Sequence, residues 1–410
     1  MERCVIEAAA GRKKAKLVFK NAQVVNVFTK QVEQADVAVE AGVIAGVGQY
    51  SGEEEVDCTG LYLCPGFVDA HIHVESTMAV PYEFARAVAM SGTTTVVADP
   101  HEIVNVCGAP AVEWLLKASE ALPVDIYWMM PSSVPATPFE TNGAPFTAQE
   151  MAPFAQMGPR VAGLGEVMCY PDVVAGTGEI YGKLALFAHK HIDGHAPGLS
   201  GKALAAYAAA GIETEHECTS FAEAKEKLAA GLAILVREGS AAKNLTAIVE
   251  GLLKEGLPTD RFLFCTDDKH LDDIAREGHI RWNVHQAVQL GMPVVDAICM
   301  ASYNAARVYG LKGVGAIAPG YRADIVLLDD WKQVHVHAVY KDGVPVEQKI
   351  AAARRVPAPA ALTHTMHFAP VTPQQLALPV QGKAHVIEMV PYQIVTRHAV
   401  EPVPSENGLF

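Results

Sequence analysis

The sequence predicts an α/β fold: a (β/α)8, TIM-like barrel joined to a small β-sandwich domain that is built from both flanks of the barrel. Three observations predict it. Eight apolar, strand-like runs alternate with helix-like segments through the middle of the chain, which is the pattern of a (β/α)8 barrel. Short strands with period-two alternation come before and after that region. Histidines and carboxylates follow several of the predicted barrel strands, where such a barrel gathers its chemistry.

Length and charge restrict the class of protein. The chain has 410 residues, of which 50% are hydrophobic and 19% charged, a composition typical of a globular protein. It exceeds the roughly 250 residues at which a single core stops growing, so we expect one large and one smaller domain. The net charge of -14 argues against nucleic acid or an anionic membrane as the main partner. A small neutral or cationic substrate fits this charge better.

Cysteine usage and the apolar runs predict the compartment. The 8 cysteines form no Cys-x-x-Cys pair, and a chain of this length does not need disulfide staples. The N-terminus lacks the apolar core of a signal peptide, and no run reaches the roughly 18 apolar residues of a membrane span. We therefore expect reduced thiols and a cytoplasmic protein.

The two flanks read as β structure. Residues 1–62 contain alternating runs separated by turn residues, and the same texture returns in residues 313–350, so we expect the two flanks to pair into one small β domain. The runs are Leu17–Phe28, Ala35–Glu40, Val43–Val47, Ala323–Leu328 and Val334–Val344. Residues 351–410 are rich in alanine and proline, which predicts a linker followed by the start of a truncated C-terminal domain.

Residues 63–312 carry the barrel pattern. The predicted strands are Gly66–His73, Thr94–Asp99, Val124–Met130, Val161–Val167, Ile192–Ala196, Ile212–Glu217, Ala233–Arg237 and Arg261–Asp267. Segments rich in Ala, Leu, Glu and Lys lie between them and predict helices. Neither a Gly-rich dinucleotide motif nor a proper P-loop is present, which argues against an open doubly wound sheet.

The first barrel strand ends in the sequence His71-Ile-His73-Val-Glu75. Alternate side chains of a strand share one face, so these three side chains should converge, and imidazole is the commonest metal ligand in proteins. The 16 histidines of the chain make chance His-x-His pairs expected. We interpret His189/His191 as the approach to a strand and His335/His337 as an exposed face.

Further polar side chains stand at the ends of the other predicted strands. They are Asp99, His101, Glu166, His195, His216, Glu217, Asp267 and Asp268. Burying so much charge costs several kcal/mol per group unless an ion compensates it. Four histidines and two carboxylates are too many for one tetrahedral zinc. They suit two divalent ions bridged by Glu166 and a hydroxide, with Asp267 as the proton acceptor, the machinery of hydrolysis at an sp² carbon.

The same residues resemble a known family. Pro65-Gly-Phe-Val-Asp-Ala-His-Ile-His73, with a flanking β domain, resembles the amidohydrolase superfamily. Further strings are similar to bacterial adenine deaminases: Asp99-Pro-His-Glu-Ile-Val-Asn105, Met130–Thr141, Gly163-Leu-Gly-Glu166, Asp193-Gly-His195, Glu215-His216-Glu-Cys and Cys265-Thr-Asp267-Asp268. The resemblance runs from about Lys16 to Tyr340. It implies the conversion of adenine and water to hypoxanthine and ammonia in purine salvage. It also implies two divalent ions, manganese first, with iron or zinc as alternatives.

Carried over residue by residue, the resemblance assigns roles. The metal ligands are His71, His73, Glu166, His195, His216 and Asp267. Glu166 bridges the ions and Asp267 is the proton shuttle, so these two are the catalytic residues. Glu75, Asp99, His101, Glu217 and Asp268 are expected to orient the ligands or contact the substrate. Members of this family usually continue through a further C-terminal domain.

Two alternatives to adenine deamination stay open. One is another cyclic amidase or nucleobase deaminase of the same superfamily, because the sequence does not identify the walls of the substrate pocket. The other is an inactive, metal-binding fragment. We expect adenine to be the small-molecule partner, with no nucleic acid and no membrane, and we expect a homo-oligomer.

Overall fold

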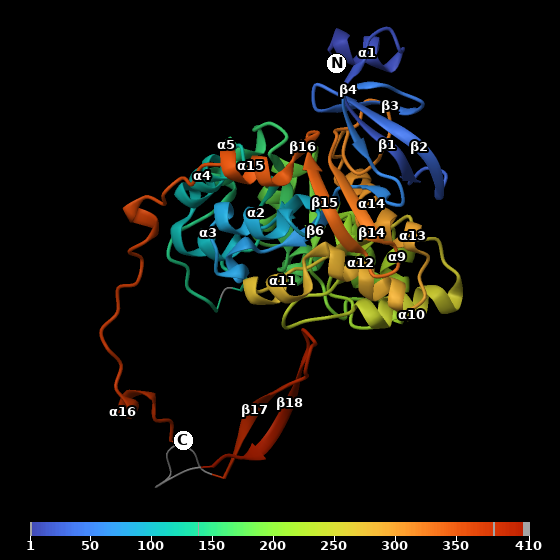
Figure 1. Cartoon of the computed structure of the whole chain (residues 1–410). Coiled ribbons are helices and arrows are strands. Elements are labelled where there is room, and N and C mark those ends of the chain that lie inside the picture. Colours follow the sequence, from blue (N-terminus) through green and yellow to red (C-terminus); the bar gives the residue numbers. More distant parts are fainter. Residues whose placement is uncertain (1, 138, 380–381, 405–410) are drawn as a thin grey trace.

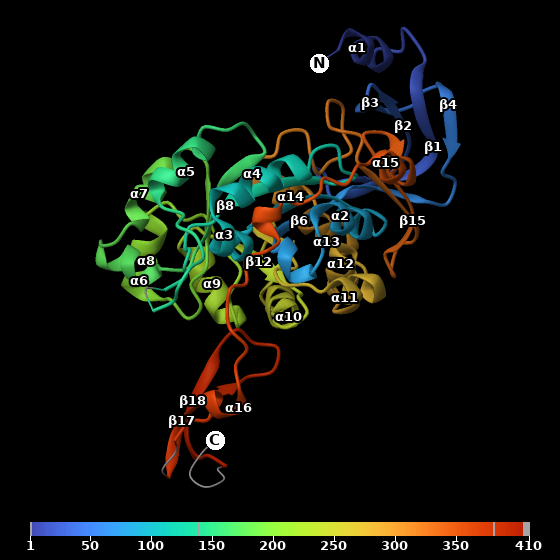
Figure 2. The same cartoon turned by 90° about the vertical axis from the view of Figure 1, so that its left-hand side faces the viewer.

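A computed structural model describes residues 2–137, 139–379 and 382–404. Its centre is a barrel of eight parallel strands (Figures 1 and 2), as the alternation of strands and helices predicts. The strands form two sheets, in the orders β10-β9-β8-β7-β6 and β11-β12-β13. Their bounds are β6 Phe67–Ile72, β7 Thr93–Ala98, β8 Asp125–Met130, β9 Val161–Val167, β10 His191–Gly194, β11 Thr214–Glu215, β12 Ala233–Arg237 and β13 Phe262–Cys265.

The ring closes where β13 meets β6. A parallel bridge joins Ile72 to Asp267, and the Asp267 N–H donates to the carbonyl of His71 at 2.9 Å. The buried carboxylate of Asp69 reinforces this closure, because its Oδ1 accepts from the backbone N–H of Thr266 at 3.1 Å. At the other junction, between the two sheets, the N–H of Glu213 donates to the carbonyl of Ile192 at 3.0 Å.

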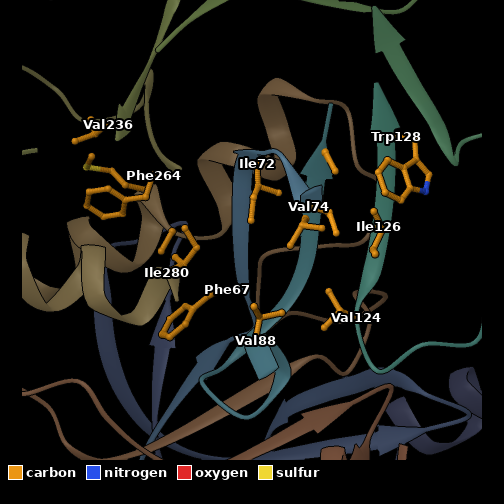
Figure 3. Close-up of a cluster of buried hydrophobic side chains, with 14 of the residues drawn as sticks. Phe67, Ile72, Val74, Val88, Val124, Ile126, Trp128, Val236, Phe264 and Ile280 are labelled. Atoms are coloured by element: carbon orange, nitrogen blue, oxygen red, sulfur yellow. The ribbon is translucent and has the colours of Figure 1, made fainter. Parts of the chain in front are cut away.

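Helices surround the ring (Figure 2). They are α2 Pro81–Ala89, α3 His101–Cys107, α4 Ala109–Ala118, α5 Ala148–Ala155, α6 Tyr170–Ala175, α7 Ile180–Phe187, α8 Gly201–Ala209, α9 Phe221–Ala229, α10 Leu245–Glu255, α11 Leu271–Glu277, α12 Ile280–Gln289, α13 Val294–Met300 and α14 Tyr303–Val308. Their apolar faces meet the outward side chains of the strands. Figure 3 shows part of this core, in which Phe67 lies near Val88 of α2 and Ile280 of α12, while Trp128 lies beside Ile126 of β8.

The flanks form one branched sheet of eight strands, in the order β16-β15-β14-β5-β1-β2-β3 with β4 paired to β1. The bounds are β1 Ala15–Asn26, β2 Gln31–Glu40, β3 Val43–Gly48, β4 Gly52–Asp57, β5 Tyr62–Pro65, β14 Ile325–Asp330, β15 His335–Lys341 and β16 Val344–Pro345. The predicted pairing of the two flanks is confirmed, because β14 runs antiparallel to β5. His335 and His337 lie on the exposed face of β15, as expected.

One element near the N-terminus differs from the expectation of strands. Residues Arg3–Ala9 form helix α1. Val5 and Ala8, three residues apart on one face of this helix, are buried against Ala15 and Val18 of β1. One or two helical turns are too short for the hydrophobic period of about 3.6 residues to be recognised in the sequence.

The residues after the small sheet begin with α15 Val346–Ala352 and η2 Ala360–Leu362. This part of the predicted linker packs on the barrel, because Trp114 Nε1 donates to the carbonyl of Pro357 at 3.2 Å. Helix α16 Pro373–Leu376 and the hairpin β17 Lys383–Met389 and β18 Thr396–Pro402 lie outside the barrel (Figure 1). The turn of the hairpin touches the barrel, because the N–H of Lys243 donates to the carbonyl of Tyr392 at 3.0 Å. The domain boundaries at residues 62, 312 and 350 stay predictions. Among the described residues, none of the helices combines the length and the apolar character that a membrane crossing requires.

Candidate metal centre

The ends of β6 and β13 bring the first group of ligand atoms together. His71 Nε2 lies 3.2 Å from His73 Nε2. His73 Nε2 in turn lies 3.2 Å from Glu166 Oε1 and 3.1 Å from Asp267 Oδ1. All four side chains are buried. The closure of the barrel therefore places Asp267 beside two histidines from the opposite end of the barrel sequence.

The ends of β9, β10 and β11 supply a second group. Glu166 Oε2 lies 2.6 Å from His195 Nδ1 and 3.2 Å from His216 Nε2. Glu217 adds a further carboxylate, with its Oε1 3.2 Å from His216 Nε2 and 3.4 Å from His195 Nδ1. The structure thus brings together all six side chains that the sequence suggested as ligands.

Glu166 belongs to both groups. One ligand atom from each of Glu166, His195, His216 and Glu217 lies within 4.8 Å of the others, and the same holds for His71, His73 and Glu166. The two oxygens of one carboxylate therefore point to two sets of imidazoles. This arrangement is suited to a pair of cations that share one carboxylate.

Local sequence explains how Glu166 is held. Asp99 Oδ2 accepts from the backbone N–H of Glu166 at 3.0 Å. This approach requires Gly165, because a Cβ there would lie 2.1 Å from the same Asp99 oxygen. On the other side, the hydroxyl of Ser132 donates to the Glu166 carbonyl at 2.6 Å. The Gly163-Leu-Gly-Glu166 string thus leaves room at the strand end for Asp99 and Ser132 to approach within hydrogen-bond distance.

Asp267 has an unusual backbone. Its φ is 57°, in the left-handed region that non-glycine residues enter at a cost of about 1–3 kcal/mol. The strand β13 has already ended at Cys265, and the N–H of Asp267 is held by the His71 carbonyl. The turn aims the carboxylate into the site, and the closure of the ring sustains it.

The five residues expected around the ligands have different positions. Asp99 orients Glu166, and His101 Nδ1 lies 3.1 Å from Glu166 Oε1. Glu217 lies within the second ligand group, and Asp268 accepts a hydrogen bond from Ser76. The expectation that Glu75 converges with His71 and His73 is wrong: strand β6 ends at Ile72 and a 3-10 turn begins at Val74. Glu75 Oε1 instead accepts from the N–H of Ile103 at 3.3 Å.

Sequence reasoning missed Arg237, the last residue of β12. Its Nη1 donates to Glu217 Oε1 at 2.8 Å and also to the carboxylate of Asp267. The guanidinium is buried between these acids. The signal was available, because Arg237 ends a predicted strand, where the other site residues lie. Asn244 was also missed; its Nδ2 donates to the carbonyl of His216 at 3.1 Å.

The electrostatics of the site indicate that it can bind divalent cations. Glu166, Glu217 and Asp267 are buried acids; burial opposes their ionisation, but neighbouring positive groups hold the pKa of each below its usual range. Burial also opposes protonation of His73 and His216, yet the carboxylates raise both pKa values well above normal. Without an ion, protons on the imidazoles balance the acids. Divalent cations can replace those protons and bind the freed imidazole nitrogens, so the donor set fits them.

The fold and the site define a metal-dependent hydrolase, and the sequence over residues 62–346 matches the amidohydrolase family. The chain belongs to this family. Its sequence is 48% identical over 401 residues to adenine deaminase of Desulfitobacterium hafniense (strain Y51), covering 98% of this chain and 70% of that protein. It is 45% identical to adenine deaminase 2 of Carboxydothermus hydrogenoformans, covering 99% of this chain and 71% of that protein.

Solved structures share the fold at lower identity. A β-aspartyl dipeptidase from Fervidobacterium islandicum AW-1 is 19% identical, with a TM-score of 0.59 and coverage of 80% of this chain and 96% of that one. An enamidase of the amidohydrolase superfamily is 18% identical, with a TM-score of 0.58 and coverage of 81% and 96%. The predicted TIM-like barrel is confirmed. Family membership and the donor set together define a divalent-metal site, whereas a cytoplasmic location and a homo-oligomer stay predictions.

Proposed function

We propose that the protein deaminates adenine to hypoxanthine and ammonia with the help of two divalent cations. The observation that carries this proposal is the position of Glu166 between two sets of imidazoles. The similarity to proteins named adenine deaminase over nearly the whole chain supports the substrate. The proposed ligands are His71, His73, Glu166, His195, His216 and Asp267.

The donor set suits manganese, iron or zinc. All six proposed ligands offer imidazole nitrogen or carboxylate oxygen, and none offers a thiolate. Carboxylates suit manganese, and imidazole suits iron and zinc. We propose manganese as the working metal, with iron or zinc as alternatives. When bound, the two cations would lower the pKa of a water molecule and polarise the substrate carbon.

Asp267 is the proposed proton shuttle. One of its oxygens is bonded to Arg237, and the other faces His73 Nε2 at 3.1 Å. A carboxylate so held can accept a proton from the attacking water and return it to the departing amino group. In this reaction a C–O bond forms at C6 of adenine, the C6–N bond breaks, and the nitrogen leaves as ammonia.

The surrounding acids and His101 have supporting roles in the proposal. Asp99 fixes the backbone of Glu166, and Arg237 fixes the carboxylates of Glu217 and Asp267. His101, which lies beside Glu166, and Asp268, which follows Asp267, are the candidates for contacts with the purine edge. Glu75, bonded to the backbone of Ile103, is proposed to support this region from the turn after β6. Partners of this kind orient ligands and tune their basicity.

The direct test is turnover by the full chain loaded with Mn²⁺. We expect ammonia release with a matching change of the ultraviolet spectrum from adenine to hypoxanthine. A panel of other purines, pyrimidines and cyclic imides, assayed at the same metal loading, separates adenine deamination from other activities of the superfamily. A protein that holds two ions but turns over a cyclic imide and leaves adenine intact would contradict the proposed substrate. A metal-loaded protein that turns over nothing would support an inactive fragment.

A further inference from the structure

The junction between β10 and β11 is a weak point in the barrel. Among the described residues, β10 ends one sheet and β11 begins the other, so the two neighbours are not paired in a ladder. His195 follows β10 and His216 follows β11. Two proposed ligands therefore stand on opposite sides of a junction that strand pairing does not hold.

The carboxylate of Glu215 spans this junction. Its Oε2 accepts from the backbone N–H of Ala196 at 3.0 Å, and its Oε1 accepts from the N–H of Glu217 at 2.6 Å. Ala196 directly follows His195, and Glu217 directly follows His216. The bond to Ala196 crosses the junction, where a strand ladder would otherwise do so, and the bond to Glu217 fixes the carboxylate on its own segment. Both bonds lie at the residues next to the two histidines.

Lys227 of α9 binds the other polar group of the Ala196 backbone, its carbonyl. Its Nζ donates to the carbonyl of Ala196 at 2.7 Å and lies 3.4 Å from Glu215 Oε2. A further hydrogen bond of 2.8 Å joins Nζ to Glu223. The side chains of Lys227 and Glu215 are both 0% exposed. Both polar groups of the Ala196 backbone are therefore held by one fully buried ion pair.

We propose that Glu215 and Lys227 are positioning residues of the metal centre, which fix the separation of His195 and His216 across the junction of the two sheets. This inference rests on the ligand set proposed above. A buried ion pair is a poor device for stability alone, because apolar residues of similar volume serve as well or better. The Glu215–Lys227 pair instead fixes the positions of the metal ligands. Removing such partners around a metal site commonly changes the metal affinity by about 10–100-fold.

The test is Mn²⁺ binding to the full chain after removal of metal, followed by the electron paramagnetic resonance signal of free Mn²⁺. The variants are Lys227→Met, which removes the charge, and Glu215→Gln, which keeps the size but has one acceptor oxygen. We expect each to weaken the binding of at least one Mn²⁺ by about 10-fold or more. If Lys227→Met does not fold, Glu215→Gln decides alone.

Lys341 provides a matched control. It forms a buried ion pair with Asp324 at 2.6 Å in the small sheet, with side chains 2% and 4% exposed. Lys341→Met should lower the thermal midpoint as Lys227→Met does, but it should leave the affinity for Mn²⁺ unchanged. The comparison separates positioning of the ligands from a general loss of stability.

Two results would overturn the inference. One is wild-type affinity for two Mn²⁺ ions in both Glu215→Gln and Lys227→Met, with only the thermal midpoint lowered. The other is a wild-type protein that binds no Mn²⁺. If the ions bind to the wild type and bind more weakly to the variants, but adenine is not turned over, the positioning role stands and the proposed substrate fails.

Discussion

The guanidinium of Arg237 donates a hydrogen bond to the carboxylate of Asp267 inside the barrel mouth. The same nitrogen contacts Glu217, so one buried cation orients the proposed proton shuttle and a carboxylate of the second ligand group. Strands β12 and β13 are adjacent, and Arg237 pairs with Cys265 in their register. Its position relative to Asp267 therefore follows from the barrel itself.

Replacing Arg237 tests this relationship. Arg237→Met should lower kcat by about 100-fold, because the two carboxylates lose their fixed orientation, and should lower stability by about 3–5 kcal/mol. Arg237→Lys should be intermediate, since an ammonium keeps the charge without the planar fork. Steady-state kinetics with saturating Mn²⁺ measure the effect, and Arg261→Met, at an exposed site, is the control. Wild-type kcat in Arg237→Met would contradict the role.

Glu166→Gln tests the shared carboxylate. The amide keeps the size of the side chain but offers one acceptor oxygen without charge, so it cannot serve two cations equally. We expect metal content to fall from two ions to one or fewer and kcat to fall by at least about 100-fold. Elemental analysis and an ammonia assay measure the two quantities. Glu255→Gln, which alters a surface pair with Lys225, should change neither, and a fully loaded, active Glu166→Gln variant would refute the bridging role.

Metal removal should destabilise the fold as well as stop the reaction. Ions that bind only the folded state stabilise it by about 2.7 kcal/mol at a concentration 100 times the dissociation constant. A chelator should therefore lower the thermal midpoint, and Mn²⁺ should restore it together with ammonia release. Calorimetric scans with and without the ion make the measurement. Identical midpoints would show that the buried acids and imidazoles do not hold a cation.

Acid should weaken the contact between the barrel and the small sheet. Asp125, at the start of β8, lies 2.5 Å from Lys341 Nζ and also contacts Arg322. Burial opposes ionisation of Asp125, but the two cations outweigh it and hold its pKa below the ordinary 3.8. The stabilisation of the folded state by ionised Asp125 is therefore complete above that pH. It is lost as the pH falls below about 4 towards the pKa of the folded state.

Asp125→Asn should remove this part of the pH dependence. Free energies of unfolding, measured from urea titrations at several values below pH 5, compare the variant with the wild type. The two curves should converge as the pH falls. A constant difference over the whole range would show that the charge of Asp125 contributes nothing.

The sequence predicted the strands well where their signal is continuous. Val161–Val167 and Ala233–Arg237 were predicted with the bounds that the structure has, because each is an apolar run with clear limits. Strand β11 is only Thr214–Glu215, shorter than predicted, since on the β10 side a single backbone bond from Glu213 to Ile192 and the carboxylate of Glu215 stand in place of a ladder. A pattern of residue types does not reveal such a replacement.

The ligand candidates could be predicted because strand ends in a barrel share one face. Glu75 was misplaced because the same rule was extended past the end of β6 into a 3-10 turn. Lys227 escaped prediction for another reason. It lies inside a helix rich in charged residues, where a lysine normally faces solvent, and its burial depends on contacts with Ala196 and Glu215 from other elements.

The division of the ring into arcs of five and three strands has a consequence for how the molecule comes apart. Its weakest joints lie where β10 meets β11 and where β13 meets β6, and each joint is flanked by residues proposed to hold cations. Ions bound at these joints would hold the two arcs of strands together. Loss of the ions and opening of the ring should then be a single cooperative event, first visible as faster amide hydrogen exchange around Glu215 and Asp267.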